Sequence, residues 1–153
     1  MDQDAFRRTY RDVNERSCAY EKSVLTNQCD CAQAERFCIA EREGVRCRSE
    51  EGQARCLELL AVLREQARFA LRTDQDKSAL PHGKAIRIQV GGLRGLHVLL
   101  HPEQDPPTTI ADVDALTRAV AEKFGRFDAL PFSRIMQHIA AYQGRRRVRR
   151  RDR

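Results

Sequence analysis

Apolar positions repeat at helical spacing along most of the chain. The clearest repeat covers residues 50–72, where apolar side chains return every three or four positions and so share one helix face. Ser49 can act as an N-cap before this segment, and Glu50 and Glu51 stand in the first turn, where the helix dipole favours acidic groups. The apolar stripe consists of Cys56, Leu59, Leu60, Leu63, Ala67, Ala70 and Leu71.

Shorter segments predict further helices. Gly44 and Gly125 each follow a helix-favouring segment at the position of a C-terminal cap, and Thr109 can cap the start of another. Pro131 is tolerated in the first turn of the last helix. We therefore expect helices over residues 1–16, 18–26, 32–43, 110–124 and 131–143.

Residues 84–101 fit two interpretations. Ile86, Ile88 and Val90 alternate as in a strand, whereas Ile86, Val90 and Leu93 also lie on one helical face. We favour a helix, because no other segment shows a strand pattern that could pair with this one. Glycines 91, 92 and 95 then predict close packing against a neighbouring helix rather than a phosphate-binding loop.

The predicted fold class is mainly α. Hydrophobic residues make up 41% of the 153 residues, too many for a fully disordered chain. The expected organisation is a Cys-rich helical metal-binding part over 1–72, a helical part over 80–144 packed on it, and a basic disordered tail over 145–153. The N-terminus is charged throughout and no apolar run approaches the roughly 20 residues of a membrane span. We expect a cytoplasmic protein without a transmembrane segment.

All six cysteines lie between positions 18 and 56. In a reducing compartment such clustering favours thiolate ligation of a soft metal over disulfides, although free cysteines also pack well in cores. The spacing lacks the Cys-x2-Cys pair of zinc knuckles and ferredoxin loops, so it indicates a metal without identifying it. An iron–sulfur cluster is our leading expectation, with zinc as the alternative.

Cys29, Cys31 and Cys47 lie in turns or loops, where a side chain can be aimed without disturbing a core. Cys56, on the apolar stripe of its helix, and Cys38, in the middle of the expected 32–43 helix, both have a plausible core role, and Cys38 is the weaker candidate. A shared centre requires at least three thiols within about 7 Å of a common point. The expected metal ligands are Cys18, Cys29, Cys31, Cys47 and Cys56.

The C-terminal tail carries the whole formal net charge of +6. Guanidinium groups at this density bind polyanions by pairing with phosphate or carboxylate and releasing counterions. The target could be nucleic acid, an anionic lipid surface or an acidic protein patch, and a merely solubilising terminus is the alternative. The expected polyanion-binding residues are Arg145, Arg146, Arg147, Arg149, Arg150, Arg151 and Arg153.

No combination of nucleophile, base and orienting group stands out, and acidic pairs such as Asp112 and Asp114 fit solvated helix faces. We therefore expect no independent enzyme. The sequence predicts a metal-binding protein that serves a larger complex or redox partner as electron carrier, redox sensor or accessory subunit. The alternatives are a zinc-stabilised nucleic-acid-binding regulator and a metal-free helical adaptor.

Overall fold

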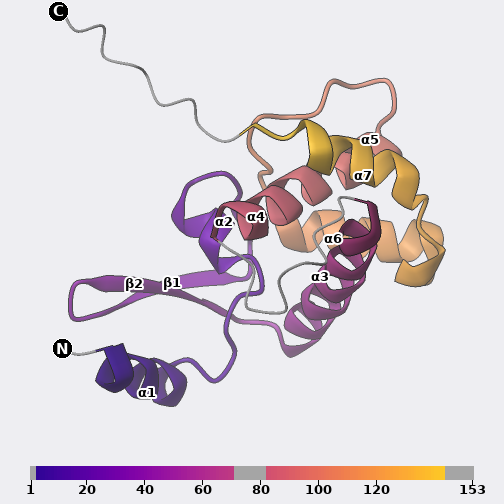
Figure 1. Ribbon diagram of the computed structural model, residues 1–153. Helices are drawn as coiled ribbons and strands as arrows, with labels where there is room; N and C mark the ends of the chain where they lie inside the picture. The colour runs from indigo at the N-terminus through magenta and orange to yellow at the C-terminus, as the bar shows by residue number, and fades with distance from the viewer. Residues whose placement is uncertain (1–2, 71–81, 144–153) are drawn as a thin grey trace, which may run out of the picture.

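The computed structural model describes residues 3–70 and 82–143 (Figure 1). The expected mainly helical fold is confirmed, with the addition of one two-stranded sheet. The elements are α1 (Gln3–Val13), α2 (Glu21–Leu25), β1 (Ala34–Ile39), β2 (Arg42–Cys47), α3 (Glu50–Ala70), α4 (His82–Ile86), the π-helix η1 (Arg87–Gly91), α5 (Gly92–Leu100), α6 (Val113–Phe124), the 3-10 helix η2 (Phe127–Ala129) and α7 (Phe132–Ala141).

The helix predicted over residues 32–43 is wrong, because β1 and β2 form an antiparallel hairpin there. Ala40 takes a left-handed backbone conformation (φ 55°) at the turn. Gly44 is not a helix cap but the partner of Phe37 across the two strands, where the ring leaves no room for a side chain. Cys38 accordingly lies on an exposed strand position and not in a helix.

The long helix α3 begins where the sequence predicts. The Ser49 hydroxyl accepts a hydrogen bond from the backbone N–H of Gly52 at 2.9 Å, as an N-cap does. Leu59, Leu60, Leu63 and Ala67 are buried, so this part of the predicted stripe packs on the rest of the molecule. Ala70 is exposed, and Leu71 lies outside the described residues.

Residues 84–100 are helical, as we expected. Within this segment the helix changes from the α-helical to the π-helical hydrogen-bonding pattern over η1. A Cβ atom on Gly91 would lie 2.7 Å from the Cα of Ile139, and one on Gly95 would lie 3.1 Å from the Cα of Ile135. The predicted close packing through glycine is therefore confirmed, and its partner is α7. In Figure 1, α5 and α7 lie side by side at the top of the molecule.

The start of α6 differs from the prediction. Asp112, and not Thr109, is the N-cap, since its carboxylate accepts a hydrogen bond from the backbone N–H of Asp114 at 3.1 Å. The same oxygen accepts from the N–H of Ala32 at 3.0 Å, which ties the segment before β1 to α6. Gly125 ends the helix with a φ of 75°, as the sequence predicts.

One hydrophobic core joins the two parts of the chain. Its buried members extend from Tyr20 and Val24 through Leu59, Leu60 and Leu63 of α3 to Ile139 of α7. The proposed division at 72 and 80 remains a prediction, and residues 71–81 and 144–153, the arginine tail included, lie outside the described residues. In the ranges described, no helix is both long enough and apolar enough to cross a membrane.

Candidate metal centre

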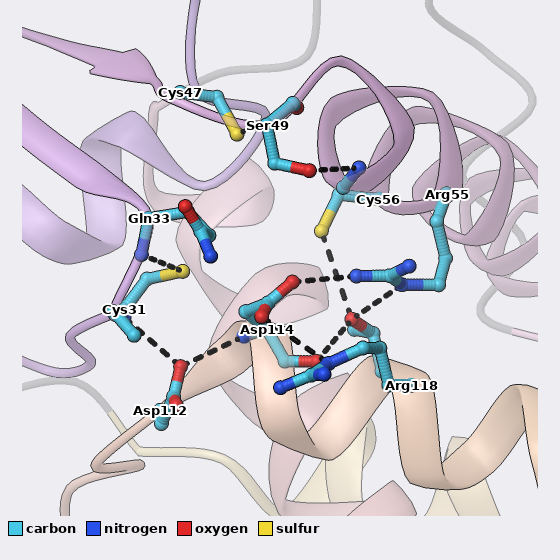
Figure 2. A network of polar contacts seen from close by, with 12 residues as sticks. Cys31, Gln33, Cys47, Ser49, Arg55, Cys56, Asp112, Asp114 and Arg118 are labelled. Atoms are coloured by element: carbon cyan, nitrogen blue, oxygen red, sulfur yellow. Dashed lines mark hydrogen bonds and ion pairs between the residues drawn. The ribbon is translucent and has the colours of Figure 1, made fainter.

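Four of the five predicted ligands line a single cavity: Cys18, Cys31, Cys47 and Cys56. They come from four places in the fold, namely the turn before α2, the loop before β1, the last residue of β2 and the second turn of α3. Figure 2 shows the sulfur atoms of Cys31, Cys47 and Cys56 pointing into the space between the hairpin, α3 and α6. The sequence clustering of cysteines thus corresponds to a clustering in space.

Backbone pairing brings Cys18 beside Cys47. The N–H of Cys18 donates to the carbonyl of Val45 at 3.0 Å, and the N–H of Cys47 donates to the carbonyl of Arg16 at 2.7 Å. The chain before α2 therefore runs antiparallel to β2, with a bridge between Ser17 and Arg46. This short pairing adds a third line of backbone next to the hairpin and fixes two thiols on one wall.

Local hydrogen bonds orient the other two thiols. The carboxylate of Asp30 accepts from the N–H of Cys31 at 2.8 Å, and the turn closes with the N–H of Ala34 donating to the carbonyl of Cys31 at 3.1 Å. Cys56 follows the Ser49 cap by two helical turns, so the cap also sets where its sulfur lies.

Three of the four sulfur atoms, those of Cys31, Cys47 and Cys56, each lie next to a polar group. The N–H of Gln33 donates to the sulfur of Cys31 at 3.4 Å, and the thiol of Cys47 donates to the carbonyl of Ser49 at 3.1 Å. The sulfur of Cys56 lies 4.0 Å from the hydroxyl oxygen of Thr117. The N–H of Gln33 is a donor that stabilises negative charge on the sulfur of Cys31, whereas the carbonyl of Ser49 is an acceptor that favours the protonated thiol of Cys47.

Burial keeps three of the cavity thiols protonated. It raises the pKa of Cys18 to about 12 and that of Cys56 to about 11, and it also raises the pKa of Cys31. The thiols of Cys31, Cys56 and Cys47 lie close enough to Cys18 to raise its pKa further by electrostatic repulsion. At neutral pH Cys18, Cys31 and Cys56 are therefore uncharged.

An ion-pair network around the buried carboxylate of Asp114 lies beside the thiols. Asp114, on the cavity wall, is 5% exposed. It pairs with Arg55 at 2.6 Å through one oxygen and with Arg118 at 3.3 Å through the other (Figure 2). The expectation that Asp114 belongs to a solvated helix face is wrong, because the cap at Asp112 turns it toward α3.

The remaining cysteines lie outside the cavity lining. Cys29 is buried in the core, where burial raises its pKa to about 12, with Cys18 and Cys31 as electrostatic neighbours. Cys38 is exposed on the hairpin. The structure thus brings four of the predicted ligands together, whereas Cys29 lies in the core and does not line the cavity.

The thiols surround a space and do not converge on one atom. The centre of a water-sized atom can move within about 20 Å³ of the cavity. Among the described residues, no three or more Cys, His, Asp or Glu side chains are arranged so that they could hold a single metal ion. The predicted metal therefore remains a prediction, and the shared cavity is what the structure adds to it.

Among the lining residues that the sequence did not predict are Tyr20 and Asp114. Tyr20 lies within the segment 18–26 that was predicted as a helix, and its side chain is 1% exposed and lines the cavity. Its position two residues after Cys18 is the only signal in the sequence that links it to the site.

Comparisons with protein-family models, curated proteins and solved structures give no match to this chain. The function is therefore argued from the residues and their arrangement alone.

Proposed function

We propose that this protein is a small iron–sulfur protein that serves a larger system as electron carrier, redox sensor or accessory subunit. Cys18, Cys31, Cys47 and Cys56 are the proposed ligands, and Cys29 is left out of the set because it does not line the cavity. The observation that carries the proposal is the shared cavity of four thiols from four separate segments. Four cysteine thiolates are the usual ligand set of such a cluster.

A cluster places its own iron and sulfide atoms between the thiolates, so the four sulfurs need not approach one shared atom.

The electrostatic surroundings also suit a cluster that carries negative charge. Buried thiols with raised pKa values become ligands only as a cation replaces their protons, so loading releases protons. The one carboxylate on the wall, Asp114, is already neutralised by Arg55 and Arg118. Backbone N–H groups of Gln33 and Asp114 point to the sulfur of Cys31 and offset part of its charge.

Purification without oxygen tests the proposal. We expect a brown protein that bleaches with dithionite and contains iron and sulfide at up to about four of each per chain. Cys31→Ser and Cys56→Ser should each lose most of the iron, whereas Cys38→Ser should keep it, because Cys38 is exposed on the hairpin away from the cavity.

Other outcomes would replace the proposal. A colourless protein with about one zinc per chain would support the zinc-stabilised regulator instead. A protein that binds neither metal after anaerobic reconstitution, and that melts unchanged with the four cavity cysteines replaced by Ser, would support the metal-free adaptor.

The proposed docking element is the arginine-rich segment 145–153, which pairs with a polyanionic partner. Its seven arginines predict steeply salt-dependent retention on nucleic acid or on anionic vesicles. Deleting residues 145–153 should abolish that retention and leave the iron content unchanged. Equal retention of the shortened chain would remove the role proposed for this segment.

A further inference from the structure

Tyr20 presents a buried hydroxyl that the protein does not satisfy. Its side chain is 1% exposed, and the hydroxyl has no hydrogen-bond partner within the described part of the chain. Leaving a buried polar group unpaired costs about 1 to 3 kcal/mol, and buried tyrosines normally find a partner. An orphaned donor of this kind points to a missing acceptor.

The surroundings of Tyr20 indicate where that acceptor lies. The residue lines the same cavity as the four thiols. Cys18, two residues earlier in the chain, lines it as well. A tyrosine hydroxyl carries a proton at neutral pH, so this side chain has a hydrogen-bond donor to offer.

We propose that the Tyr20 hydroxyl donates a hydrogen bond to a sulfur atom of the cluster and so raises its reduction potential. The inference rests on the proposed function and assigns Tyr20 as a tuning residue, not a ligand. Reduction adds negative charge to the sulfur atoms, and a donor stabilises that charge more in the reduced state than in the oxidised state. The cluster sulfur is the acceptor that the hydroxyl lacks.

The backbone around Tyr20 fixes this geometry. Tyr20 precedes α2 directly, and its carbonyl accepts from the N–H groups of Ser23 and Val24 at 3.0 Å each. Its own backbone hydrogen bonds to Cys18 and lowers the pKa of that thiol against the larger effect of burial. One residue thus contacts a ligand through its main chain and reaches the cavity with its side chain.

The test is Tyr20→Phe in the full chain, purified with its cluster without oxygen. The substitution removes one oxygen atom and keeps the ring in the core. We expect unchanged iron content and a more negative reduction potential, with the equilibrium against a fixed redox partner shifted about tenfold, or about 59 mV for one electron. The iron–sulfur stretching frequencies in resonance Raman spectra should shift as well.

Tyr142→Phe is the matched control. Its hydroxyl hydrogen bonds to Gln28, and Tyr142 belongs to a separate buried cluster with Ile86 and Val90. The same loss of an oxygen there should leave the potential and the Raman frequencies unchanged.

The possible outcomes distinguish a failure of the proposed function from a failure of the tuning role of Tyr20. A wild-type chain that takes up no iron overturns the proposed function, and the tuning role of Tyr20 falls with it. A loaded Tyr20→Phe protein with unchanged potential and spectra overturns the tuning role alone. If Tyr20→Phe loads no cluster, 3-fluorotyrosine incorporation into the wild-type chain decides: its more acidic hydroxyl should raise the potential, and no change would overturn the inference.

Discussion

Burial at single residues governs how the metal-free protein responds to pH. Burial raises the pKa of Cys18 and Cys29 from the ordinary 9.0 to about 12. In the unfolded chain these thiols ionise from about pH 9, while in the fold they keep their protons. The stability that protonated thiols contribute is therefore complete below pH 9 and is lost as the pH rises from 9 toward 12.

We predict that the free energy of unfolding of the metal-free, reduced protein falls above pH 9 by about 1 kcal/mol per buried thiol for the first pH unit. Urea denaturation at pH 7, 9 and 10 measures this. In Cys29→Ala, the fall in the free energy of unfolding above pH 9 should be smaller by the contribution of one thiol. Val24→Ala, which truncates a fully buried side chain without a titrating group, should lower stability equally at each pH. An unaltered pH response in Cys29→Ala would contradict the prediction.

Asp114 and Asp128 show how exposure decides the value of an ion pair. Both carboxylates accept from an arginine, at 2.6 Å from Arg55 and 2.7 Å from Arg126, but the side chain of Asp114 is 7% exposed and that of Asp128 is 59% exposed. We predict that Asp114→Ala lowers the free energy of unfolding by about 2 kcal/mol and that Asp128→Ala lowers it by less than about 0.5 kcal/mol. Comparable losses in chemical denaturation would argue against this account.

At the scale of elements, periodicity predicted α3, α5, α6 and α7 because their apolar faces are buried in one core. The hairpin could not be found in this way. Its residues favour a helix locally. The ring centroids of Phe37 and Tyr10 lie 5.9 Å apart, however, and the N–H of Val45 donates to the carboxylate of Glu21 at 2.9 Å. These partners come from α1 and α2, so contacts distant in sequence decide the strand conformation.

The contact between α5, η1 and α7 depends on small residues. We predict that Gly91→Ala lowers the free energy of unfolding by about 1 to 3 kcal/mol, because its new methyl group would meet the backbone of Ile139 at 2.7 Å. Gly83→Ala in α4 is the control: a Cβ there meets nothing within 4 Å, so the change should be neutral or stabilising. Thermal or urea unfolding followed by circular dichroism compares the two, and equal losses would contradict the close packing.

At the scale of the whole molecule, the shared core predicts cooperative unfolding. Leu59, Leu60 and Leu63 belong to the same buried cluster as Ile135 and Ile139. We predict one transition in urea, with coincident curves from far-ultraviolet circular dichroism and tyrosine fluorescence. Two separated transitions would show that the parts before residue 72 and after residue 80 fold independently.

The sequence predicted which type of side chain gathers at the site, but not which residues do so. The clustering of cysteines in the sequence predicted a group of thiols, and four of them line one cavity. The spacing could not tell Cys29 from Cys31, two residues apart, since one enters the core and the other faces the cavity only through the turn made by Asp30. The presence of Tyr20 on the cavity wall and the burial of Asp114 likewise depend on how the hairpin, α3 and α6 meet.

The participation of α6 in the cavity has a consequence for biosynthesis. Val113 and Asp114 form part of the wall, although every thiol lies before residue 57. A nascent chain on the ribosome therefore holds all six of its cysteines long before α6 is available. The complete wall of this cavity can form only after most of the polypeptide has emerged.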